Sequence, residues 1–112
     1  MQYIHFTAKE REVLLDRLYL HDCLTEVFEG EYESEAVERA ATQIAECWLV
    51  AGEVGREVLR EAVEGSTYYA RAHDAHVYDN MSDKEWRAIL RRLKSIEKKM
   101  EKAGIPARFP RW

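Results

Sequence analysis

Glycine and proline are scarce in this chain, which contains only five glycines and two prolines among 112 residues. Alanine, glutamate, leucine and arginine are abundant, and these residue types favour helix over sheet. The 46% hydrophobic content excludes a low-complexity or disordered chain. A chain of this length fits one domain with its own hydrophobic core. We therefore expect an all-α protein, a single helical domain covering residues 1–112.

Long apolar runs are also missing. No uninterrupted run approaches the roughly 20 residues that a membrane span needs. The N-terminal "MQYIHFTAKEREV" lacks a basic segment followed by an apolar one, so no signal peptide is expected. Cys23 and Cys47 are the only cysteines, and without a secretion signal they predict reduced thiols in a bacterial cytoplasm. A single disulfide between them stays open as an alternative.

Capping residues and apolar stripes set the expected helices. Thr7 and Glu10 form a capping box that begins the first helix, and "SDKE" at 82–85 forms a second box. Ser34 is the expected cap of another helix, which Gly52 would close. The acidic segment 25–35 is expected to be a loop or a frayed helix end. The bundle then has three long helices or four shorter ones, at 8–22, 35–51, 53–79 and 82–103, with an extended "MQYIHF" segment before them and a tail at 104–112.

The third helix raises a question of continuity, because "GST" at 65–67 resembles a break. However, an apolar stripe continues in phase through Gly65, from Val58 and Ala62 to Tyr69, Ala72 and His76. We expect one continuous helix over 53–79, in which Gly65 lies where another helix comes close. The alternative is two helices broken at 65–67.

The stretch "ARAHDAHVYDN" at 70–80 concentrates histidines and aspartates. His73 and His76 lie three residues apart on the expected helix, so both could reach one metal ion. The chain has no HExxH motif and no CxxC pair to complete such a site. We prefer a structural role, with His76 at the edge of the core and His73 partly exposed, and we expect no cofactor.

Arrangements for nucleophilic catalysis are absent from the sequence. Cys23 directly follows His21 and Asp22, but adjacent residues on a helix do not face each other. Ser66 and Thr67 follow a glycine without the strand that a nucleophile elbow requires. There is no glycine-rich phosphate loop. We therefore expect a protein that is not an enzyme.

Charge is unevenly distributed along the chain. Residues 1–81 carry 17 acidic and 7 basic side chains, whereas residues 82–112 carry 4 acidic and 10 basic ones. The basic excess forms a stripe on the last expected helix, opposite its apolar face. Such a ridge could contact nucleic-acid phosphates or an acidic protein surface; alternatively, it is a solvated face or is neutralised by the acidic helices. Tyr32 and Tyr68 are candidate aromatic contacts. The stripe consists of Arg87, Arg91, Lys94, Lys98 and Lys102.

Two segments, "LREAVEGSTYYARA" at 59–72 and "SDKEWRAILRRLKSIEKKM" at 82–100, resemble small helical proteins encoded by phages and prophages of proteobacteria. The resemblance covers about half of the chain and implies no catalytic residue. It implies binding to a host protein as the mode of action, for example to a CRISPR effector, a nuclease or a polymerase.

The leading hypothesis is a non-enzymatic interaction protein that binds and inhibits a host protein by occlusion, as an anti-CRISPR protein does. Its partner would be a host protein or a protein–nucleic-acid complex. One alternative is a nucleic-acid-associated protein that uses the basic C-terminal helix. A second is a metal-binding protein that uses His73 and His76. Homodimerisation is compatible with each, because the acidic and basic regions are complementary.

Overall fold

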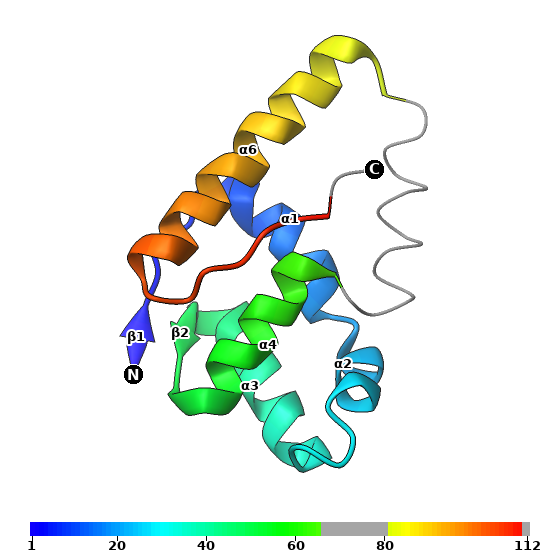
Figure 1. Cartoon of the computed structure of the whole chain (residues 1–112), viewed down its shortest axis with the longest axis vertical. Coiled ribbons are helices and arrows are strands. Elements are labelled where there is room, and N and C mark those ends of the chain that lie inside the picture. The colour runs from blue at the N-terminus through cyan, green and yellow to red at the C-terminus, as the bar shows by residue number, and fades with distance from the viewer. Residues whose placement is uncertain (66–80, 111–112) are drawn as a thin grey trace.

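The computed structural model describes residues 1–65 and 81–110 and confirms the all-α fold class (Figure 1). Helices pack around one core, and a two-stranded sheet closes one side of it. No helix within the described ranges is long and apolar enough to cross a membrane. The elements are β1 (Gln2–Tyr3), α1 (Ala8–Leu18), α2 (His21–Val27), α3 (Ser34–Cys47), β2 (Leu49–Val50), α4 (Gly52–Glu64) and α6 (Asp83–Lys102).

The N-terminal segment is extended and covers the core, as expected. Gln2 and Tyr3 pair antiparallel with Val50 and Leu49. Ile4 and Phe6 then turn into the core, where both are buried. The Gln2 side-chain amide donates a hydrogen bond to the Ala103 carbonyl, 3.0 Å away, at the end of α6. The first strand therefore links the two ends of the chain.

The first expected helix, 8–22, is divided into α1 and α2. Its predicted start is confirmed, because Thr7 and Glu10 form the reciprocal capping box. The helix ends at Leu18, and α2 occupies part of the expected loop. In one straight helix, Leu24 would lie about 120° around the axis from Leu18. The break between them allows both leucines to be buried.

The boundaries around α3 also differ from expectation. Glu33 rather than Ser34 occupies the N-cap position. At the other end Trp48, not Gly52, takes the left-handed conformation that closes the helix, with φ of 56°. Gly52 instead begins α4. The buried Trp48 ring packs edge-on against Phe6, and this contact offsets the strain of a positive φ at a non-glycine residue.

The expected continuous helix over 53–79 is wrong at Gly65, where the structure ends the helix. Helix α4 ends at Glu64, and Gly65 closes it with φ of +60°. The Arg17 Nη1 atom lies 2.7 Å from each of the carbonyl oxygens of Ala62 and Val63. The buried guanidinium of α1 therefore caps the end of α4. As expected, Gly65 lies close to another helix, α1. However, it is the residue that ends α4 and is not inside a continuous helix. Residues 66–80 lie outside the described ranges, so the course of the chain beyond this break stays a prediction.

Helix α6 is close to the expected 82–103. The Ser82 hydroxyl accepts a hydrogen bond from the Glu85 N–H and caps it. The side chains of Leu93, Ile96 and Met100 are buried. The tail then folds back along the bundle, with Phe109 buried and its ring beneath the Arg17 guanidinium, whose centre lies 4.8 Å from the ring centroid.

Candidate functional site

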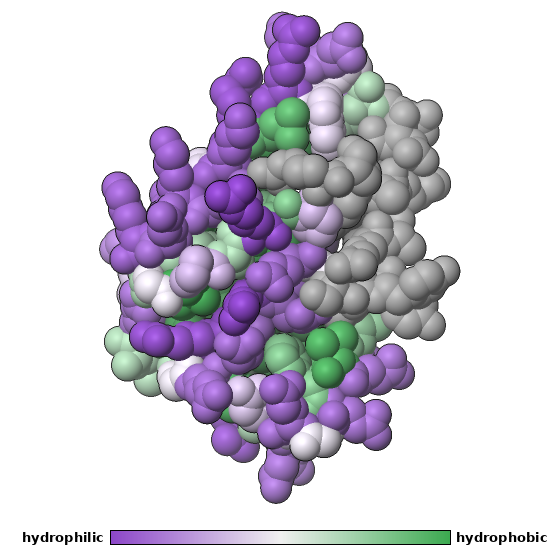
Figure 2. Space-filling view, viewed as in Figure 1, coloured by the Kyte–Doolittle hydropathy of each residue, from purple (hydrophilic) through white to green (hydrophobic). Residues whose placement is uncertain are grey.

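The candidate site is the outer face of α6, which we call the basic ridge. All five of its side chains are exposed, as the spacing predicts. At 1.5 Å per residue, the ridge extends about 22 Å along the helix axis. Figure 2 shows strongly hydrophilic side chains projecting along this side of the molecule. The ridge consists of Arg87, Arg91, Lys94, Lys98 and Lys102.

The ridge is not neutralised within the described part of the chain. None of its five cations lies within ion-pair distance of a carboxylate there. Among residues 1–65 and 81–110, the alternative in which acidic neighbours neutralise the basic helix therefore finds no ion pair at these five cations. Unpaired cations on one rigid helix produce a positive potential along its length.

On the inner side of α6, Lys99 differs from the five ridge cations because it forms an ion pair with a buried residue. The Lys99 ammonium lies 2.5 Å from the Glu10 Oε1 atom of α1. Burial raises the pKa of the Glu10 carboxyl, but hydrogen bonds from Lys99, Ser95 and the Thr7 N–H outweigh burial and hold this pKa below its ordinary value. The Glu10–Lys99 pair therefore joins α1 to α6 and takes no part in the exposed ridge.

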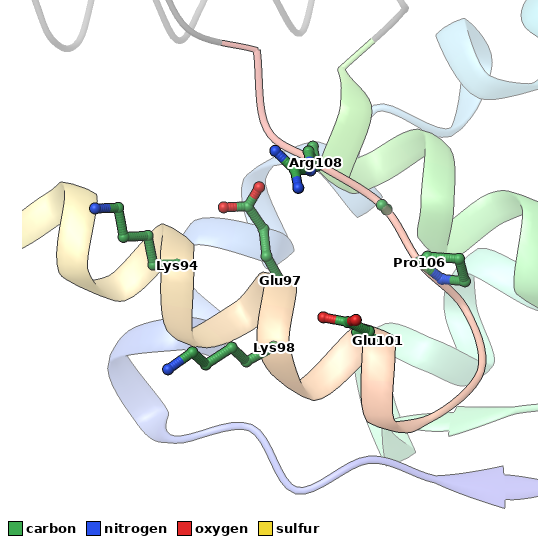
Figure 3. A pocket seen from close by; sticks show the side chains of 7 residues that line it. Lys94, Glu97, Lys98, Glu101, Pro106 and Arg108 are labelled. Carbon is green, nitrogen blue, oxygen red and sulfur yellow. The ribbon is translucent and has the colours of Figure 1, made fainter.

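An open cleft of about 400 Å³ lies between α6 and the returning tail (Figure 3). Lys94 and Lys98 of the ridge form part of its lining, and Arg108 lines it from the tail. Glu97 and Glu101 also line it, and the Glu97 carboxylate accepts a hydrogen bond from the Phe109 N–H. The mixed charges make this cleft a polar border of the ridge rather than a pocket for an apolar ligand.

A second charged surface lies on α2, the α2–α3 connection and the start of α3. We call it the acidic end. Figure 1 places these elements at the lower end of the molecule, away from the upper part of α6. Its six carboxylates are all exposed and none forms an ion pair with another described residue. The acidic end consists of Glu26, Glu29, Glu31, Glu33, Glu35 and Glu38.

The two candidate tyrosines have different outcomes. Tyr32 is only partly exposed, and its ring packs against Phe28 with centroids 5.6 Å apart. Burial, a hydrogen bond to Glu53 and nearby glutamates raise the pKa of Tyr32. Tyr32 thus helps to fix the α2–α3 connection beside α4. Tyr68 lies outside the described residues, so its role stays a prediction.

The described residues contain no group of three or more histidine, cysteine, aspartate or glutamate side chains that could hold a metal ion. The candidate ligands His73 and His76 lie outside these residues and remain untested. Both cysteines are free thiols. Burial, together with Glu26 and Asp22, raises the pKa of Cys23, which disfavours the reactive thiolate form.

Sequence reasoning missed the burial of two charged residues, of which one is paired with α6 and the other contacts α4 and the tail. Glu10 and Arg17 are 2% and 3% exposed. Their signal was present in the spacing, since Glu10 lies four residues before Leu14 and Arg17 three residues after it. Charged residues in phase with an apolar stripe indicate buried, partnered groups.

Comparison of the chain with protein-family models, with curated proteins and with solved structures finds no match. The resemblance to phage-encoded helical proteins therefore stays a prediction, and the exposed surface of α6 is the feature that bears on function.

Proposed function

We propose that this protein is a non-enzymatic binding protein that docks the basic ridge of α6 on an acidic surface of another protein and occludes it. One observation supports this proposal most strongly: five cations are exposed on one face of α6, and none has an ion-pair partner in the described ranges. Such a row of positive charges speeds association with a protein that has an acidic surface and disfavours binding to a protein with a basic surface.

The observations favour a protein partner over nucleic acid. Cations alone can contact phosphates and guanine edges, but reading of adenine uses amide side chains, which α6 lacks. Ser95, the one hydroxyl residue within α6, is half-buried rather than exposed on the ridge.

The fixed position of α6 supports occlusion. The helix is joined to α1 by the Glu10–Lys99 pair and to the tail by the hydrogen bond from Phe109 N–H to Glu97. A rigid helix loses little conformational entropy on docking, so more of the interaction energy contributes to affinity. The resemblance described above makes a bacterial host protein the proposed class of partner and blockage of a defence protein the proposed consequence.

The test is capture from nuclease-treated proteobacterial lysate with immobilised protein. We expect the wild type to retain a specific protein that Arg91→Glu/Lys98→Glu fails to retain. The matched control is Arg39→Glu/Arg56→Glu, which makes the same charge change at exposed sites on α3 and α4. Equal capture by wild type and ridge variant, or no specific capture by either, would overturn the proposal.

A direct binding assay separates the two macromolecular classes. Poly-L-glutamate and a 30-base-pair DNA duplex serve as probes at about 0.15 M ionic strength, where the Debye length is about 8 Å. We expect tighter binding to poly-L-glutamate and loss of that binding in the ridge variant. If the protein binds the duplex more tightly than the polymer, and the ridge variant loses this binding, the partner is nucleic acid and the proposed protein partner is wrong.

A further inference from the structure

The chain carries two exposed surfaces of opposite charge that do not neutralise each other. The basic ridge has five cations and the acidic end has six carboxylates, with no ion pair between them among the described residues. Figure 1 shows why: α6 lies in the upper part of the molecule, and the α2–α3 connection lies at its lower end. Contact between the two surfaces therefore requires two molecules.

We propose that the basic ridge also receives the acidic end of a second copy of this chain, which gives head-to-tail self-association. This inference rests on the binding role assigned to the ridge under the proposed function and adds a second occupant for the same surface.

The two surfaces carry nearly equal numbers of opposite charges, and the ridge extends about 22 Å along α6. With five cations facing six carboxylates, the contact is close to electrically balanced.

Two basic ridges repel each other, so the ridge of one copy faces the acidic end of another. Where the two surfaces of one copy contact different neighbours, the contact is heterologous and generates open chains or closed rings. A partner with a denser acidic surface would compete for the ridge, so self-association would keep the ridge covered until that partner binds.

Sedimentation equilibrium tests the inference. In about 20 mM salt we expect the average mass of the wild type to rise above 13.2 kDa as its concentration increases from about 10 µM to 1 mM. In about 0.5 M salt the mass should return to the monomer value, because the Debye length falls to about 4 Å. A wild type that stays monomeric at 1 mM in low salt would overturn the inference.

Two complementary variants determine the geometry. Arg91→Glu/Lys98→Glu removes the ridge and Glu31→Lys/Glu35→Lys removes the acidic end, and each alone should be monomeric at 1 mM. Mixed in equal amounts, they should form dimers of about twice 13.2 kDa and nothing larger, because each retains the surface that the other lacks. A mixture that stays monomeric would contradict head-to-tail contact. All four substituted residues are exposed, so circular dichroism should show unchanged folding.

Binding to poly-L-glutamate separates this inference from the proposed function. We expect Glu31→Lys/Glu35→Lys to bind the polymer at least as tightly as wild type while losing self-association. If the wild type binds poly-L-glutamate through the ridge but never self-associates, the second-copy inference fails and the proposed function stands. If the ridge variant binds the polymer like wild type, the assigned role of the ridge fails, and the inference that rests on it fails too.

Discussion

Arg17 and Arg91 show two opposite uses of the same side chain. Arg17 is buried, donates to two carbonyl oxygens at the end of α4 and lies over the Phe109 ring. Arg91 is exposed on α6 and makes no ion pair with a described residue. The first joins three segments of the fold, whereas the second forms no ion pair with the described residues. Charge content alone therefore does not indicate which cations stabilise this protein and which are available to a partner.

Replacement of Arg17 should produce the largest loss of stability. Arg17→Met keeps much of the side-chain volume but leaves the Ala62 and Val63 carbonyls without their charged donor. Because buried acceptors that lose a charged partner are costly, we expect unfolding to become easier by about 3 kcal/mol in urea titration. Arg56→Met, at an exposed site, should change stability by less than about 0.5 kcal/mol. Equal losses for both would remove the distinction between buried and exposed arginines.

The Glu10–Lys99 pair should contribute less, because the Lys99 side chain is 31% exposed. We expect Glu10→Gln to cost about 1–2 kcal/mol at pH 7, since the amide can still accept from Thr7 N–H but loses the charge. The pKa of Glu10 is lower in the folded state, so this contribution is present above the ordinary value of 4.5 and is lost as pH falls through the folded pKa.

Urea titrations of wild type and Glu10→Gln from pH 7 to pH 2.5 measure that dependence. The stability gap between the two proteins should shrink as the pH falls. A gap of constant size would show that the charge of Glu10 contributes nothing to folding.

A substitution at Gly65 tests how tightly the end of α4 packs against the Arg17 side chain. Gly65→Ala places a Cβ 3.3 Å from the Arg17 Nη1 atom, at a φ of +60°. Gly30 has a φ of +85° and open space around it, so Gly30→Ala reports backbone strain alone. We expect about 1 kcal/mol of destabilisation for Gly30→Ala and about 1.5 kcal/mol for Gly65→Ala in urea titration. A smaller loss at Gly65 than at Gly30 would contradict the tight contact.

Local patterns in the sequence predict much of this fold. The capping residues Thr7 and Ser82 mark the starts of α1 and α6, and the stripe of Leu93, Ile96 and Met100 gives the buried face of α6. The exposed ridge follows from the same periodicity, because it is the opposite side of that helix.

The features that the sequence did not predict depend on distant partners. The stripe through Gly65 kept a helical phase, yet α4 ends there, where Arg17, 45 residues before Ala62, provides the donor for its last carbonyls. The left-handed Trp48 likewise depends on packing against Phe6. Periodicity describes one segment at a time and contains no information about such contacts.

The ridge should have the smallest effect on folding. Arg91→Glu/Lys98→Glu should change the free energy of unfolding by less than about 0.5 kcal/mol, because exposed, unpaired cations contribute little to stability. Urea titration beside Arg39→Glu/Arg56→Glu measures this change. A loss near that of Arg17→Met would place the ridge among the structural cations.

We propose that the outer face of α6 serves binding and not folding. The most direct test measures the affinity of wild type and Arg91→Glu/Lys98→Glu for poly-L-glutamate by fluorescence anisotropy at about 0.15 M ionic strength. The account predicts at least a roughly tenfold weaker affinity for the ridge variant, because two attractive charges become repulsive. Equal affinity of the two proteins for the polymer would contradict it.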